Sequence, residues 1–161
     1  IAGLQLGDRI QLRRQGEDLA TLVRSRRPHL AELVILADRI VEVEIMEGAQ
    51  DQTSAPVASA RVLRVWKPSS GLASQEMIRI PLRLPWFSEG DAELLLTLRP
   101  GERAIVFLDR EGRVFAGASG VVRLGEKNGL VQDVELGLRM PEAALKQDLE
   151  KMVAEFEQFV R

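Results

Sequence analysis

The chain has 161 residues, of which 45% are hydrophobic and 29% charged, a composition typical of a globular protein and not of a disordered one. Its formal net charge of −2 gives no general attraction to nucleic acid or to anionic lipid. Because it contains no cysteine and only 1 histidine, disulfides, thiolate metal sites and sites built from several histidines are excluded.

Residues 1–27 are interpreted as an N-terminal extension, with a short edge strand over Asp8–Arg14 and a short helical segment over Glu17–Arg24. The chain starts at Ile1 instead of Met, which suggests that a signal peptide, an anchor or another domain was removed upstream. No stretch reaches the ~20 apolar residues needed to cross a bilayer, so we expect no membrane span in this chain.

The most informative segment is Pro28–Glu47, where helical spacing changes to strand alternation. Up to Ala37 the apolar residues share one helical face, and from Val41 to Ile45 they alternate with acidic residues. The sequence therefore predicts a helix that leads directly into a strand with one buried and one solvated face. The buried positions of that strand are Val41, Val43 and Ile45.

Further strands are predicted at Val57–Trp66, Met77–Leu84, Ala104–Leu108, Val114–Phe115, Val121–Leu124 and Val134–Met140. Pro81 cannot donate to a neighbouring strand, so its strand is expected at a sheet edge or to be bulged. Arg99–Gly101 is expected to form a turn, and Asp109–Arg113 a hairpin in which Gly112 can take a positive φ.

The chain ends in a helix predicted from Pro141, over residues 141–161. Its apolar residues form a stripe that must lie against other residues. The stripe contains Leu145, Leu149, Met152, Val153, Phe156 and Val160. Packing on the rest of the chain is the first interpretation; pairing with a second copy, which would make a homodimer, or with a neighbouring domain is the second.

Short β segments with one internal and one terminal helix do not alternate as βαβ units, which indicates a mainly β fold: an antiparallel barrel or sandwich with attached helices. The segments LAELVILAD, RIVEVEI, ARVLRVWK, EMIRIPL and LRPGERAIVFLDREGRVF occur in an order that resembles tissue inhibitors of metalloproteinases. The order is still more similar to that of cysteine-free bacterial proteins with the same netrin-like OB barrel.

The resemblance covers about residues 28–125, and its most telling matches are G-E-R-x-x-x-F-L and the apolar helix that ends in A-D before the first strand. It implies a five-stranded OB-like Greek-key barrel, assigned here to residues 28–140, with the internal helix before the first barrel strand. It also implies an extracytoplasmic protein, secreted, periplasmic or attached to the envelope.

The inhibitory activity of that family is not expected here. It depends on an N-terminal cysteine that reaches the protease zinc, whereas position 1 of this chain is Ile1 and no cysteine is present.

No set of residues indicates catalysis, so we expect neither an enzyme nor a cofactor. His29 is expected to be exposed, and Ser119 is interpreted as a turn residue because no partner base is recognisable. Glu42, Glu44 and Glu47 could bind a hard cation, but a solvated strand face is the preferred interpretation, and no metal site is predicted.

Large aromatic side chains in the loop PWFSEGD provide the leading hypothesis. Trp86 and Phe87 could anchor an unidentified protein partner, or could cover the open end of the barrel. The alternative is an OB face formed by Trp66, Arg64 and Arg79 that binds oligosaccharide or single-stranded nucleic acid. We favour a binding or structural module that contacts another protein, and do not expect nucleic acid to be its ligand.

Overall fold

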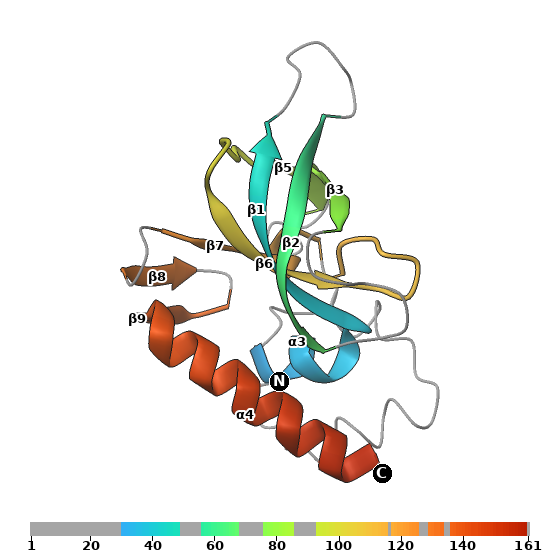
Figure 1. Ribbon diagram of the computed structural model, residues 1–161, viewed down its shortest axis with the longest axis vertical. Coiled ribbons are helices and arrows are strands. Elements are labelled where there is room, and N and C mark those ends of the chain that lie inside the picture. Colours follow the sequence, from blue (N-terminus) through green and yellow to red (C-terminus); the bar gives the residue numbers. More distant parts are fainter. Residues whose placement is uncertain are drawn as a thin grey trace.

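The computed structural model describes residues 30–48, 56–67, 76–85, 93–115, 117–125, 129–133 and 136–160. These residues form a mainly β structure: a five-stranded antiparallel sheet, two smaller two-stranded sheets and two α-helices (Figure 1). The N-terminal extension, His29 and the loop with Trp86 and Phe87 lie outside the described residues.

The predicted join between helix and strand is confirmed. Helix α3 spans Leu30–Leu36 and strand β1 spans Arg39–Glu47, so two residues separate them. The second of these, Asp38, donates its backbone N–H to the carbonyl of Leu108 at 2.9 Å, which holds the join against the sheet. The side chains of Val41, Val43 and Ile45 are buried, as their alternation predicted.

The other strands of the large sheet are β2 (Val57–Lys67), β3 (Met77–Pro81), β6 (Arg103–Leu108) and β7 (Val121–Leu124). Their order is β3-β2-β1-β6-β7. Three strands in sequence are followed by a later strand that returns beside the first, which is the Greek-key arrangement. β3 and β7 stand at the two ends of this order, so the sheet is open among the described residues.

The run Met77–Leu84, predicted as one strand, is divided at Leu82. Its first part is β3, and its second part is β4 (Arg83–Pro85), which pairs with β5 (Glu93–Leu95) in a separate two-stranded sheet. Pro81 is the last residue of β3, an edge strand, as expected from its missing N–H.

The strand predicted over Val134–Met140 is wrong. The structure has a hairpin of β8 (Leu130–Asp133) and β9 (Leu138–Pro141). Gly137 has a φ of 66°, a left-handed conformation that a continuous strand does not contain, and the Asp133 carboxylate accepts the N–H of Leu136 at 3.1 Å. This hydrogen bond and the conformation of Gly137 belong to a turn, where the alternation of side chains had suggested an extended chain.

The hairpin predicted at Asp109–Arg113 is present, and Gly112 has a φ of 82°. The strand predicted at Val114–Phe115 is reduced to a single bridge between Leu108 and Val114. A short 3₁₀ turn, η2 (Gly117–Gly120), then leads into β7.

Two apolar cores lie on opposite faces of the large sheet, because neighbouring residues of β1 belong to different cores. The helix-side core includes Leu33, Ile35, Ile40, Trp66, Phe107, Leu145, Leu149 and Phe156. The sheet-side core includes Val41, Val43, Ile45, Val62, Ile80 and Val106.

Helix α4 (Glu142–Val160) forms the cover of the helix-side core and lies beside α3 and β9 (Figure 1). Four residues of its predicted stripe are buried: Leu145, Leu149, Val153 and Phe156. These four side chains therefore pack on the rest of the chain, as in the first interpretation.

Lys67, the last residue of β2, closes the C-terminal end of α3. Its ammonium donates to the backbone carbonyls of Val34 (2.9 Å), Ile35 (3.1 Å) and Ala37 (2.5 Å). It also lies 4.0 Å from the centre of the Phe156 ring. One buried cation thus joins the internal helix, the sheet and the terminal helix.

Candidate functional site

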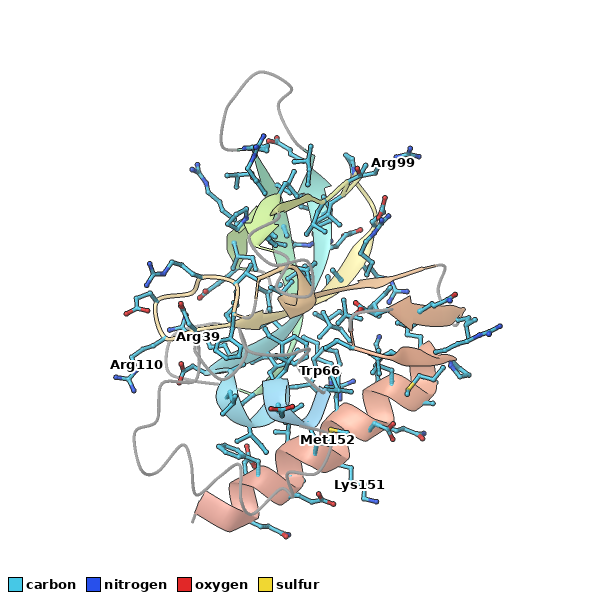
Figure 2. All side chains as sticks on the ribbon, turned by 180° about the vertical axis from the view of Figure 1, so that it is seen from behind. Arg39, Trp66, Arg99, Arg110, Lys151 and Met152 are labelled. Atoms are coloured by element: carbon cyan, nitrogen blue, oxygen red, sulfur yellow. The ribbon has the colours of Figure 1, made fainter. Side chains whose placement is uncertain are left out.

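Of the three residues proposed as an alternative ligand face, Arg64 and Trp66 are in contact, whereas Arg79 lies far from both. Trp66 is only 7% exposed, and the guanidinium carbon of Arg64 lies 4.6 Å from the centre of its ring. Arg64 is itself paired with Glu150 of α4. Figure 2 shows Trp66 on the side of the sheet next to α4. The indole is therefore not the open stacking platform that the sequence suggested.

Arg79 is exposed on β3 and lies opposite Ser59 of β2. Trp66 lies near the other end of β2, roughly 20 Å further along at ~3.3 Å per residue. A ligand short enough to touch only neighbouring side chains would not reach both.

Two of the three acidic residues of β1, Glu42 and Glu44, have basic partners. Glu42 is 6% exposed and binds Arg103 and Lys146, so its predicted solvation is wrong: α4 covers this part of the strand. Glu44 binds Arg61 at 2.7 Å, and Glu47 is exposed. Within the described parts of the chain, no three acidic or histidine side chains are placed to hold a metal ion.

A surface groove of about 730 Å³ is the strongest candidate site, and its size is within the range of about 300–1,000 Å³ typical of ligand sites. It lies between the turn that precedes β6, the end of β7 and the strand β8. Its side chains include Arg99, Glu102, Arg123, Leu124, Leu130 and Gln132.

The turn Arg99–Glu102 is a rigid wall of this groove. Pro100 and Gly101 occupy its central positions, Gly101 has a φ of 90°, and the N–H of Glu102 donates to the carbonyl of Arg99 at 3.0 Å, as in a type II turn. The turn is also bound to β1, because Gly101 donates to the carbonyl of Ile45 at 2.7 Å and Ile45 donates to that of Glu102 at 2.8 Å. Arg99 therefore starts from a fixed backbone.

The charges of the groove are arranged around Glu102. One of its oxygens accepts the backbone N–H of Arg99 at 3.2 Å, and the other accepts from the Arg123 guanidinium at 2.8 Å. The Arg123 side chain remains 52% exposed, and a guanidinium has five N–H donors, so it has further donors besides the one that Glu102 accepts. Among the described residues, the Arg99 side chain has no acidic partner.

The opposite wall is β8, which combines an apolar and a polar side chain. Leu130 is 52% exposed and Gln132 is exposed, whereas Val131 between them is buried in the helix-side core. The carbonyl of Gly129 accepts the N–H of Glu142 at 2.9 Å, which attaches the start of β8 to α4. The exposed leucine is therefore held in place and not on a free loop.

Guanidinium groups beside an apolar side chain suit the recognition of acidic groups. The sequence predicted the turn at Arg99–Gly101, but it did not indicate any residue that lines the groove as part of a site. Three segments that are separate in the chain meet here, and no local pattern indicates that they do.

Neither helix in the described part of the chain combines the length and the apolar character needed to cross a membrane.

A scan against models of protein families, a search of curated proteins and a search of solved structures each gave no match to this chain.

Proposed function

We propose that this chain is a non-enzymatic protein-binding module of the bacterial cell envelope or exterior, built on an OB-like Greek-key barrel. The order β3-β2-β1-β6-β7 supports the barrel, because the first strands form a meander and β6 returns beside β1. The sheet-side core supports it as well, since it fills the face that such a barrel encloses.

The groove between the Arg99–Glu102 turn, β7 and β8 carries the binding function. Its walls are held by backbone hydrogen bonds to β1 and α4, so its shape exists before a partner arrives. A preformed surface loses little conformational entropy on binding. Leu130 offers apolar area, and Arg123 offers directed donors, a residue type enriched where proteins meet.

Trp86 and Phe87 are proposed as a second contact with the same partner. Large aromatic side chains bury much apolar area on binding, and their loop follows β4, away from the groove in the sequence.

The test is affinity capture from an envelope extract of the source organism, with the bound proteins identified by mass spectrometry. The bait is the intact chain, the double variant Arg123→Ala/Leu130→Ala, or Arg110→Ala. Arg110 is an exposed arginine on the opposite side of the molecule from Arg99 (Figure 2), so its replacement controls for charge alone.

We expect one protein to be retained by the intact chain and by Arg110→Ala, and to be lost from the double variant. The melting temperature of the double variant should stay near that of the intact chain. A Trp86→Ala/Phe87→Ala variant should weaken capture in the same way. If all baits retain the same proteins, or none is retained, the proposed function is wrong.

A further inference from the structure

We infer that the groove binds an acidic peptide segment, in which a carboxylate binds Arg123 and Arg99 and a neighbouring apolar side chain lies on Leu130. This inference rests on the proposed function and adds the chemistry of the partner.

The charge of the groove supports an anionic partner. Glu102 is the acidic side chain of its lining, and both of its oxygens are already used, by the N–H of Arg99 and by the guanidinium of Arg123. The lining thus contains two guanidinium groups and one carboxylate, which leaves the groove positive although the whole chain has a formal charge of −2. A local potential opposite in sign to that of the protein attracts acidic segments to this place.

The geometry prepares Arg123 for such a contact. Its bond to Glu102, at 2.8 Å, orients the guanidinium plane before a ligand binds. A carboxylate that binds the remaining edge would receive charge-assisted hydrogen bonds, which are about twice as strong as neutral ones. The backbone of Arg99 is held at the turn, and its exposed side chain provides a second guanidinium in the lining.

The apolar wall distinguishes a peptide from a free anion. Leu130 is 52% exposed within the groove, and an inorganic ion would leave this area in water. A leucine or similar side chain next to an acidic residue would cover this apolar area and remove it from water, which favours binding. The groove volume of about 730 Å³ is also far larger than a single inorganic ion needs.

The experiment measures the fluorescence anisotropy of a fluorescein-labelled peptide with the sequence Glu-Leu-Glu-Glu between Gly-Ser linkers. Matched peptides carry Gln or Lys in place of Glu, and a third carries Ser in place of Leu. The proteins are the intact chain, Arg99→Ala/Arg123→Ala, Arg123→Lys, Leu130→Ser and the control Arg110→Ala.

We expect the intact chain and Arg110→Ala to bind the Glu peptide about tenfold or more tightly than the Gln peptide, and to bind the Lys peptide least. Arg99→Ala/Arg123→Ala should lose this preference, and Arg123→Lys should keep part of it, since the charge remains but the planar donors do not. Leu130→Ser should weaken binding of the Leu-containing peptide and leave the Ser-containing peptide unchanged.

Equal binding of the Glu and Gln peptides, an equal loss in Arg110→Ala, or complete displacement by inorganic phosphate at constant ionic strength would each overturn the inference. The last result would indicate a general anion site. If capture of a protein still depends on Arg123 and Leu130 while peptide charge has no effect, the proposed function stands and only the acidic partner is wrong. If capture itself does not depend on the groove, the proposed function is wrong.

Discussion

The guanidinium of Arg103 in β6 binds both carboxylate oxygens of Glu142, the first residue of α4. The Nη1–Oε2 distance is 3.0 Å and the Nη2–Oε1 distance is 2.6 Å. Glu142 is buried and Arg103 is largely buried, so this bidentate pair fixes the start of the helix on the sheet where water screens it little.

The pair belongs to a larger match of charges between α4 and the sheet. Residues spaced four apart on the helix lie on one face and alternate in sign, and they meet residues of opposite charge on three adjacent strands. The contacts are Glu142 with Arg103 of β6, Lys146 with Glu42 of β1, and Glu150 with Arg64 of β2. A shift of α4 by one turn would place like charges together, so the match specifies the helix position.

Replacement of Arg103 by Met tests the cost of opening this network. Glu42 and Glu142 would then share only Lys146 in a buried site, and we expect the free energy of unfolding in urea to fall by about 3 kcal/mol. Arg61→Met is the matched control. It breaks a pair with Glu44 that is about one third exposed, so it should cost less than about 1 kcal/mol. Equal losses in the two variants would contradict a special role for the network.

The pH dependence of stability provides a second prediction. The hydrogen bonds from Arg103 hold the pKa of Glu142 below its ordinary value. A carboxyl with a lower pKa in the folded state stabilises the protein above the unfolded pKa, near pH 4.3. That stability is lost as the pH falls through the folded pKa. We therefore expect the difference in unfolding free energy between the intact chain and Glu142→Gln to narrow as the pH falls below about 4.3, whereas a constant difference from pH 7 to pH 3 would contradict the assignment.

Lys67 is expected to contribute more to stability than an exposed lysine of the same chain. Lys67→Met keeps the apolar stem but leaves the carbonyls of Val34, Ile35 and Ala37 without this donor, and we expect a loss of about 2–3 kcal/mol in urea unfolding. Lys151 is exposed on α4 (Figure 2), and Lys151→Met should change stability by less than about 0.5 kcal/mol. Similar effects at both positions would show that the capping contact contributes little.

Tryptophan fluorescence tests the burial of Trp66. The chain has 2 tryptophans, so Trp86→Phe leaves Trp66 as the only one. The emission maximum of Trp66 should lie at a shorter wavelength than that of free tryptophan. Acrylamide should quench Trp66 several-fold less than free tryptophan, because the ring lies between Arg64 and the helix-side core. Titration with single-stranded oligonucleotides or glycans at two salt concentrations should leave it unchanged; a clear response to either would restore the alternative ligand face.

The local periodicities predicted much of the fold. The alternation from Val41 to Ile45 located β1 because residues two apart share a face, whatever the rest of the chain does. The same rule failed at Glu42, which the pattern places in water. Its burial depends on α4, whose first residue is far away in the sequence and whose position no local pattern shows.

The candidate site was less predictable for the same physical reason. Arg99 and Glu102 belong to a recognisable turn, but Arg123 and Leu130 become their neighbours only through the pairing of β6 with β7 and the hairpin that follows. Trp66 is the opposite case, because it was predicted as a site residue and belongs to the helix-side core. An aromatic residue at the end of a strand can stack on a ligand or fill a core, and the distinction depends on whether a helix covers it.

The central position of β1 also determines when the sheet can form. β1 pairs with β2 through a short connection, but its other edge pairs with β6, which is the later segment Arg103–Leu108. Closing so long a loop is entropically costly, so pairing between distant segments is typically the slow part of folding. During synthesis the β1–β2–β3 meander leaves the ribosome first, with the backbone donors and acceptors along one edge of β1 still unpaired. Until Leu108 has emerged, this edge of β1 can pair with other nascent chains. Once β6 pairs with β1, the donors and acceptors of the edge are occupied.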